Sequence, residues 1–112
     1  MNTLSDALRA AEFAVTAELA LTPKQTATDI VAAAKGLQTV TDAVQIPDHR
    51  YARPHISPVA VAAHLLAAGL DPIVRMNCRD RNRLAVQSEL LAAQSFGVSN
   101  LILARGNDLP ED

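Results

Sequence analysis

The chain has 112 residues, a formal net charge of −2 and 49% hydrophobic residues, and these values exclude several functional classes. At this length it can bury one modest core, so we expect a single domain over residues 1–112. Ten basic residues, with no long basic run and no interleaved aromatics, argue against a nucleic-acid partner. No apolar run reaches membrane-spanning length and the first residues lack a signal-peptide pattern, so we expect no membrane partner and a cytoplasmic location.

Four short segments are predicted to be buried parallel strands, because each is brief, rich in β-branched residues or leucine, and bounded by Pro, Gly, Asp or Asn. The predicted strands lie near residues 13–19, 42–47, 72–77 and 99–105. Their starts recur about every 29 residues, which fits one strand, one helix and two loops. The sequence therefore predicts an α/β fold of about four parallel βα units.

Stretches with helical spacing of apolar residues separate these strands, and a short helix precedes the first strand. The predicted helices run over 4–12, over 28–35, from Ser57-Pro58 to Gly69, and from Asp80 or Arg81 to Phe96. Gly36 and Gly97 are the expected C-terminal stops of the second and fourth of them. This alternation suits two architectures: an open doubly wound sheet, or a βα barrel, of which four units make half.

In both architectures functional groups gather at the carboxyl ends of the strands. Glu18 interrupts an apolar stretch at the first strand end, where burial would raise the pKa of its carboxyl group, as a general acid at neutral pH requires. The alternative is a strand-end glutamate that is paired with an arginine or solvated. In the turn after the fourth strand, Gly106 would allow close backbone approach to a ligand. Arg105 could donate hydrogen bonds to an anion, and Asp108 could accept hydrogen bonds.

Other motifs narrow the chemistry. Neither a Rossmann glycine fingerprint nor a P-loop is present. His49, His55 and His64 do not stand at metal-ligand spacing with Cys78, the only cysteine, so we expect no metal site and no disulfide. A local cluster of arginines suits either one anionic ligand or a solvated helix start, and comprises Arg75, Arg79, Arg81 and Arg83.

The segment CRDRNRLAVQSELLAA, followed by FGVSNLILARG, resembles the methylenetetrahydrofolate reductase family. Family members carry a similar cysteine-arginine-aspartate-arginine-asparagine-arginine stretch, a leucine-rich helix, a glycine, and a strand that ends in a glycine-aspartate turn. Upstream, VTAEL, TDAVQIPD and AAGLDPIVR follow in the family's order and spacing. The resemblance covers the chain from about Phe13 to Pro110.

The resemblance implies half of a TIM-type (β/α)8 barrel that binds FAD at the carboxyl ends of its strands. Members take a hydride from NADH or NADPH onto the flavin and pass it to 5,10-methylenetetrahydrofolate, which gives 5-methyltetrahydrofolate. The family's general acid at the end of strand one matches Glu18. Its aspartate after strand four matches Asp108 or, if the turn carries a one-residue insertion, the position of Asn107. The implied flavin contacts are Pro47, Asp48, Arg75, Asn77, Ala104, Arg105, Gly106 and Asn107.

An alternative is a non-catalytic half-barrel that binds a flavin or a folate-like ligand only when it is paired with another chain. Four parallel strands leave two unpaired edges and an uncovered face. We therefore expect the chain to act as a homo-oligomer or with a second half of the barrel. A small open α/β module with an unrelated partner is the third possibility.

Overall fold

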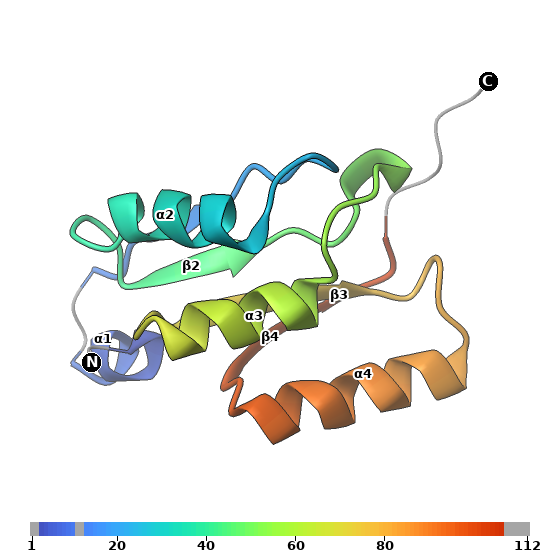
Figure 1. The fold of residues 1–112 in the computed structure, drawn as a ribbon. Helices are drawn as coiled ribbons and strands as arrows, with labels where there is room; N and C mark the ends of the chain where they lie inside the picture. Colours follow the sequence, from blue (N-terminus) through green and yellow to red (C-terminus); the bar gives the residue numbers. More distant parts are fainter. Residues whose placement is uncertain (1–2, 11–12, 107–112) are drawn as a thin grey trace.

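The computed structural model describes residues 3–10 and 13–106, and it shows one sheet of four parallel strands that alternate with helices (Figure 1). The strands are β1 (Thr16–Glu18), β2 (Ala43–Ile46), β3 (Pro72–Asn77) and β4 (Asn100–Ala104). The helices are α1 (Leu4–Arg9), α2 (Ala27–Leu37), α3 (Pro58–Ala67) and α4 (Arg83–Phe96), and a 3-10 turn, η1 (Arg50–Ala52), follows β2. The predicted α/β fold of four parallel units is confirmed.

The strands lie in the order β1-β2-β3-β4, so the sheet grows in one direction. Crossovers between parallel strands are right-handed in nearly all proteins, so this order places every crossover helix on the same face. Figure 1 shows α2, α3 and α4 together on that face. The described strands contain no reversal of order, which the doubly wound alternative requires.

The core lies between this face of the sheet and the helices. Side chains alternate along a strand, and Val44, Ile46 and Val74 point toward the helices, where each is at most 1% exposed. Leu65 of α3 and Ile30 of α2 meet them from the helix layer and are also buried. Helix α3 is buried along most of its length because it packs on β2 and β3 with α2 and α4 on either side.

The helix ends differ from the sequence predictions at three places. Helix α2 begins after Thr26, whose hydroxyl and the carboxylate of Asp29 form a capping box, and it continues through Gly36, so Gly36 is not its stop. Helix α4 begins at Arg83 because Asn82 caps it, two or three residues later than predicted. Helix α1 ends at Arg9 rather than reaching residue 12.

Strand β1 is shorter than the predicted segment 13–19. Its neighbours on the chain still bond to β2, since the Leu19 amide donates to Gln45 at 2.9 Å and the Val15 amide donates to the Asp42 carboxylate at 2.8 Å. Glycine ends two helices as predicted, with Gly69 at φ +82° and Gly97 at φ +85°.

Within the described residues, no further strand pairs with either edge of the sheet, and apolar side chains are exposed near both edges. On the β4 side Leu101 is 42% exposed and Leu103 is 61% exposed, and on the β1 side Phe13 is 92% exposed. The helix layer also leaves apolar side chains in solvent, among them Leu84 and Leu91 of α4. Within the described residues, none of the helices is long and apolar enough to cross a membrane.

Replacing Leu65 with alanine should lower the free energy of unfolding by about 2–5 kcal/mol, because it removes a fully buried side chain and leaves a cavity. The matched control is Leu84→Ala, which truncates a leucine that is 73% exposed and should change stability by about 0.5 kcal/mol or less. Urea unfolding followed by circular dichroism measures both. Equal losses in the two variants would contradict the assigned core.

Candidate functional site

Two adjoining pockets lie at the carboxyl ends of the strands. The first has a volume of about 420 Å³ and extends from Glu18 at the end of β1 to His55 in the loop before α3. The second has a volume of about 340 Å³ and reaches from the end of β2 to Arg75 on β3 and Gly106 after β4. Pro47, Arg50 and Tyr51 line both pockets, so the two form one concave region with a shared wall.

Six of the ten residues singled out from the sequence line these pockets: Glu18, Pro47, Asp48, Arg75, Asn77 and Gly106. Ala104 is half-buried and Arg105 is exposed, and neither lines either of these two pockets. Asn107 and Asp108 lie outside the described residues. The structure thus brings together residues from four separate strand ends, as the parallel topology predicts.

Asp48 is the most constrained of the six, because its carboxylate is buried and already fully engaged. It accepts a hydrogen bond from the Asn77 amide at 2.7 Å and pairs with both terminal nitrogens of Arg81, one of them at 3.1 Å. The Asn77 side chain donates in return to the Asp48 carbonyl at 2.9 Å. Asp48 therefore joins the end of β2 to the end of β3 and to the segment before α4, and we call these three residues the strand-end clamp.

The arginine-rich motif at residues 78–83 consequently has three structural roles. Arg81 enters the strand-end clamp, and its hydrogen bonds to Asp48 raise the pKa of its guanidinium. Arg79 pairs with Asp80, which lowers the pKa of that carboxyl group, and also donates to the His49 carbonyl at 3.3 Å. Asn82 caps α4, whereas Arg83 is exposed. Most of the motif organises the loops around the pockets.

Glu18 does not have the buried environment that the sequence predicted. Its side chain is 29% exposed, since β1 is an edge strand that pairs with β2 alone among the described strands. Arg50 Nη2 lies 2.8 Å from Oε1 and 3.0 Å from Oε2 of Glu18, so both carboxylate oxygens share one guanidinium nitrogen. The expected desolvation of Glu18 is wrong for this structure, and the alternative of a strand-end glutamate paired with an arginine describes it.

Glycine is required at position 106 for two reasons: its backbone conformation and its close approach to neighbouring side chains. Its φ is +94°, and a Cβ placed there would lie 2.8 Å from Cβ of Arg79 and 3.3 Å from Cβ of Asn77. A side chain at this position would therefore press against the turn after β3. Close packing of two turns explains this glycine without a ligand.

Arg75 differs from Arg50 and Arg79, the other two arginines of the smaller pocket, whose side chains are paired. It is half-buried on β3 and lines the smaller pocket, and its side chain makes no hydrogen bond or ion pair with the part of the chain that the structure describes. A guanidinium without a partner in a polar concavity is suited to bind an anionic group such as a phosphate.

The loop between β2 and α3 contains an unusual backbone that sequence reasoning missed. His49, Tyr51 and Ala52 have φ values of 49°, 56° and 59°, in the left-handed region that residues with side chains seldom adopt. Each such residue costs on the order of 1–3 kcal/mol and keeps this conformation only where its surroundings hold it, and such strain concentrates at functional sites. No glycine marks this loop in the sequence, so no pattern signals its conformation.

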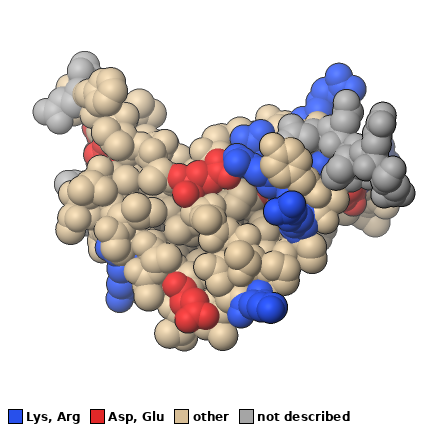
Figure 2. Space-filling view, turned by 90° about the horizontal axis from the view of Figure 1, so that it is seen from above, with Lys and Arg blue, Asp and Glu red and all other residues tan. Residues whose placement is uncertain are grey.

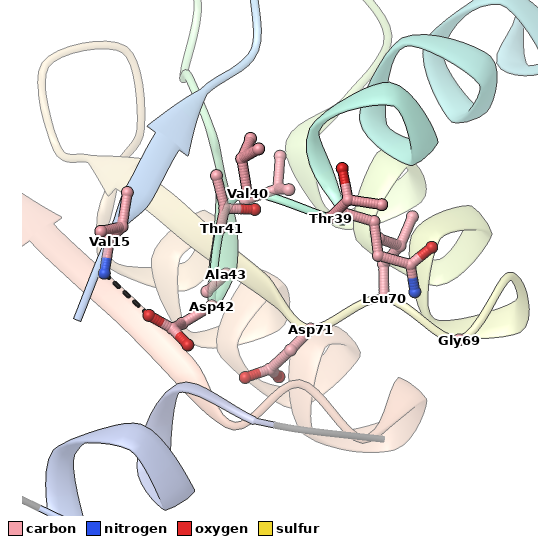
Figure 3. Close-up of a pocket in the computed structure, with 11 residues that line it drawn as sticks. Val15, Thr39, Val40, Thr41, Asp42, Ala43, Gly69, Leu70 and Asp71 are labelled. Carbon is pink, nitrogen blue, oxygen red and sulfur yellow. Dashed lines mark hydrogen bonds between the residues drawn. The ribbon is translucent and has the colours of Figure 1, made fainter. Parts of the chain in front are cut away.

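A third pocket, of about 470 Å³, lies at the opposite, amino end of the strands (Figure 3). Its labelled residues lie just before β1, β2 and β3 and at the first residue of β2, and Asp42 on its wall accepts a hydrogen bond from the Val15 amide. Asp71 also has partners, because it accepts from the Leu4 amide at 2.8 Å and from Asn100 at 3.0 Å. These carboxylates fasten chain segments together, and parallel α/β proteins place their chemistry at the other end.

Charge also distinguishes the carboxyl end. In the view of Figure 2, basic side chains gather toward the right-hand end, where Figure 1 shows the strands ending, and acidic side chains lie next to some of them. The pocket residues with positive charge there are Arg50, Arg53, Arg75 and Arg79. Within the described residues, no group of three or more His, Cys, Asp or Glu side chains is placed to hold a metal ion.

A comparison of the chain with models of known protein families finds no match, and neither does a comparison with curated proteins. The family resemblance therefore depends on the motifs quoted above and on the residues they bring to the pockets.

Replacing Arg81 with glutamine should lower the free energy of unfolding by about 3–5 kcal/mol, because it leaves the buried Asp48 carboxylate without its guanidinium. Arg83→Gln is the control, since it removes an exposed arginine of the same motif and should change stability by about 0.5 kcal/mol or less. Chemical unfolding of both variants decides the matter. A loss for Arg81→Gln no larger than that of the control would refute the strand-end clamp.

Proposed function

We propose that the chain is the first half of a methylenetetrahydrofolate reductase-like flavoprotein, with FAD bound at the carboxyl ends of the strands and NADH or NADPH as the hydride donor. The substrate would be 5,10-methylenetetrahydrofolate and the product 5-methyltetrahydrofolate. One observation carries the proposal: six residues that the family resemblance assigns to catalysis or flavin contact line two adjoining pockets at one end of the sheet.

The winding of the sheet also supports the proposal. A barrel requires strands that follow one another in order with all crossover helices outside, and the order β1-β2-β3-β4 meets this condition. In such a barrel the face opposite the helices lines the interior. By strand register, Glu18, Gln45 and Ile73 share one row on that face, and Arg75 stands two residues further along β3.

The residues around the smaller pocket fit a flavin dinucleotide in part. Arg75 is available for a phosphate group, and the lining is mostly polar. Asp48 fits less well, because its carboxylate is already engaged by Arg81 and by the Asn77 amide. Its proposed role is therefore to hold Asn77 and the turn after β3 in place, while Pro47 and Tyr51 offer apolar contact.

A bound flavin would supply the hydride chemistry, since it accepts a hydride from a nicotinamide and returns it to an electrophilic carbon. The task proposed for Glu18 is to hold a proton for the nitrogen released when the folate ring opens. Arg50 occupies both of its oxygens in this structure, so the ion pair has to open before Glu18 meets a substrate.

The remaining strands have to come from a second half of the barrel or from a second copy of the chain. Edge strands β1 and β4 are parallel to each other, so another parallel four-stranded unit can pair with both at once. Covering these edges would bury apolar side chains that stand in solvent here, among them Leu101, Leu103 and Phe13.

The alternative, a half-barrel that binds a flavin or a folate-like ligand without catalysis, is favoured by the surroundings of Glu18. That carboxylate lies on an open edge and is paired with Arg50, whereas Arg75 in the neighbouring pocket is available for a ligand. Binding and catalysis are therefore tested separately.

Titration of the purified chain with FAD, followed by quenching of flavin fluorescence, should show saturable binding. Arg75→Gln should weaken binding about 10- to 100-fold, as the loss of one charge-assisted hydrogen bond predicts. Arg83→Gln, which changes an exposed arginine outside both pockets, should bind as the wild type does. No binding by the wild type, or equal affinity of the two variants, would contradict the proposed flavin site.

Replacing Glu18 with glutamine should lower folate reduction by about 10²- to 10⁴-fold, because it removes the proposed proton donor, and should leave FAD affinity unchanged. Glu89→Gln on α4 is the charge-matched control and should retain turnover. Steady-state oxidation of NADH or NADPH in the presence of the folate measures both. Full turnover by Glu18→Gln would exclude its catalytic role, and flavin binding without any turnover would favour the non-catalytic alternative.

A further inference from the structure

The segment from Asp48 to Ile56 joins β2 to α3 and forms the wall between the two strand-end pockets. Residues from it line both of them, notably Arg50 and Tyr51. Its backbone is strained at three residues that carry side chains. The loop therefore keeps this conformation only because contacts with neighbouring groups stabilise it. The contacts that stabilise this loop therefore also determine the shape of the two pockets.

One histidine ring supplies the central contact. The backbone amide of His49 donates to Nε2 of His55 at 3.0 Å, and Nδ1 of His55 lies 2.7 Å from the Ile56 carbonyl. A neutral ring meets both demands in one tautomer only, with its proton on Nδ1 and a lone pair on Nε2. The rings of His49 and His55 are also stacked, with centroids 4.4 Å apart and an interplanar angle of 29°.

Protonation of His55 is incompatible with this arrangement. A proton on Nε2 would point at the amide hydrogen of His49, so two donors would face each other at hydrogen-bond distance. Burial lowers the pKa of His55, and His49 lowers it further, whereas the Ile56 carbonyl and Asp48 act in the opposite direction. Nδ1 of His49 is buried and has no hydrogen-bond partner in the part of the chain that the structure describes, while its Nε2 lies 3.8 Å from Oδ1 of Asp48.

The other charged groups around the His55 ring also disfavour its protonation in the closed loop. Glu18, Arg50 and Arg53 line the pocket that His55 borders, and Arg79 donates to the His49 carbonyl. Glu18 is the one acidic side chain of that pocket, and Arg50 already occupies it. Asp48 is likewise engaged by Arg81. A new positive charge on His55 therefore enters a neighbourhood whose carboxylates already have partners.

We propose that the loop of residues 48–56 is a proton-operated latch, closed when His55 is neutral and released when His55 takes up a proton. Release withdraws Arg50 from Glu18 and removes the wall between the two pockets. His55 binds a proton more readily in the released loop than in the closed loop. The closed latch is therefore stable above the ordinary histidine pKa of about 6.5. Its stability is lost as the pH falls below that value.

The chain contains a built-in reporter for this motion. Tyr51 is the only tyrosine and there is no tryptophan, so the intrinsic emission of the protein comes from the latch itself. Between pH 8 and pH 5 the anisotropy of this emission should fall in one transition with a midpoint below about 6.5. Far-UV circular dichroism should stay constant over the same range, since the sheet and helices remain folded.

Variants of His55 separate the latch from general effects of acid. Glutamine can accept the His49 amide at every pH, so His55→Gln should keep high anisotropy from pH 8 to pH 5. Arginine is always protonated, so His55→Arg should show low anisotropy already at pH 8. His64→Gln is the control, because it removes an exposed histidine of α3 and should retain the wild-type transition.

Each outcome decides the proposal independently of flavin binding. Absence of a transition in the wild type, or its persistence in His55→Gln, would overturn the latch. High anisotropy of His55→Arg at pH 8 would overturn it as well, since it would show that a permanent charge at this position leaves the loop closed. Loss of the transition in His64→Gln would assign the titration to α3 and contradict the role of His55.

Discussion

The arrangement of the strand-end face depends on one buried ion pair, between Asp48 and Arg81. A carboxylate that is only 4% exposed has to be paired and hydrogen-bonded, because an unpaired charge at such a position is strongly destabilising. Asp48 meets this demand through residues from the end of β3 and the segment before α4. The loops after β2 and β3 therefore form one unit, and the pocket that contains Arg75 is bounded by that unit.

The two pockets differ in how firmly they are built. The pocket next to Arg75 is bounded by the strand-end clamp and by the close contact of Gly106 with Arg79. The pocket next to Glu18 is bounded by an edge strand and by the strained loop of residues 48–56. Under the proposed function, a firmly built pocket for the cofactor beside a less firmly built pocket for the substrate would suit an enzyme that retains its cofactor and exchanges its substrates.

The sequence predicted the fold well because its signals are local. Strand β3 was predicted with the bounds that it has, and the stops at Gly69 and Gly97 follow from left-handed glycine. Gly36 misled the prediction, because a capping box and burial of Ile30 and Ala34 stabilise α2 enough for the helix to continue through it.

The site was less predictable because its contacts join distant parts of the chain. The strand ends follow from topology, so Glu18, Asp48 and Arg75 could be placed there from the sequence, and each of them lines one of the pockets. Their partners do not follow from topology: 33 positions separate Arg81 from Asp48, and 32 separate Arg50 from Glu18. Exposure of Glu18 also depends on which strands cover the sheet edge, which no local pattern encodes.

The most direct test of the account is to map which residues respond to FAD by following backbone amide resonances during a titration. If FAD binds at the carboxyl ends of the strands, the resonance shifts should concentrate at residues 48–51, 75–79 and 104–106. No resonance shifts should occur at residues 38–44 and 69–71, which line the pocket at the amino end (Figure 3). Shifts confined to the amino-end pocket, or none at saturating FAD, would contradict the assignment of the carboxyl ends as the flavin site.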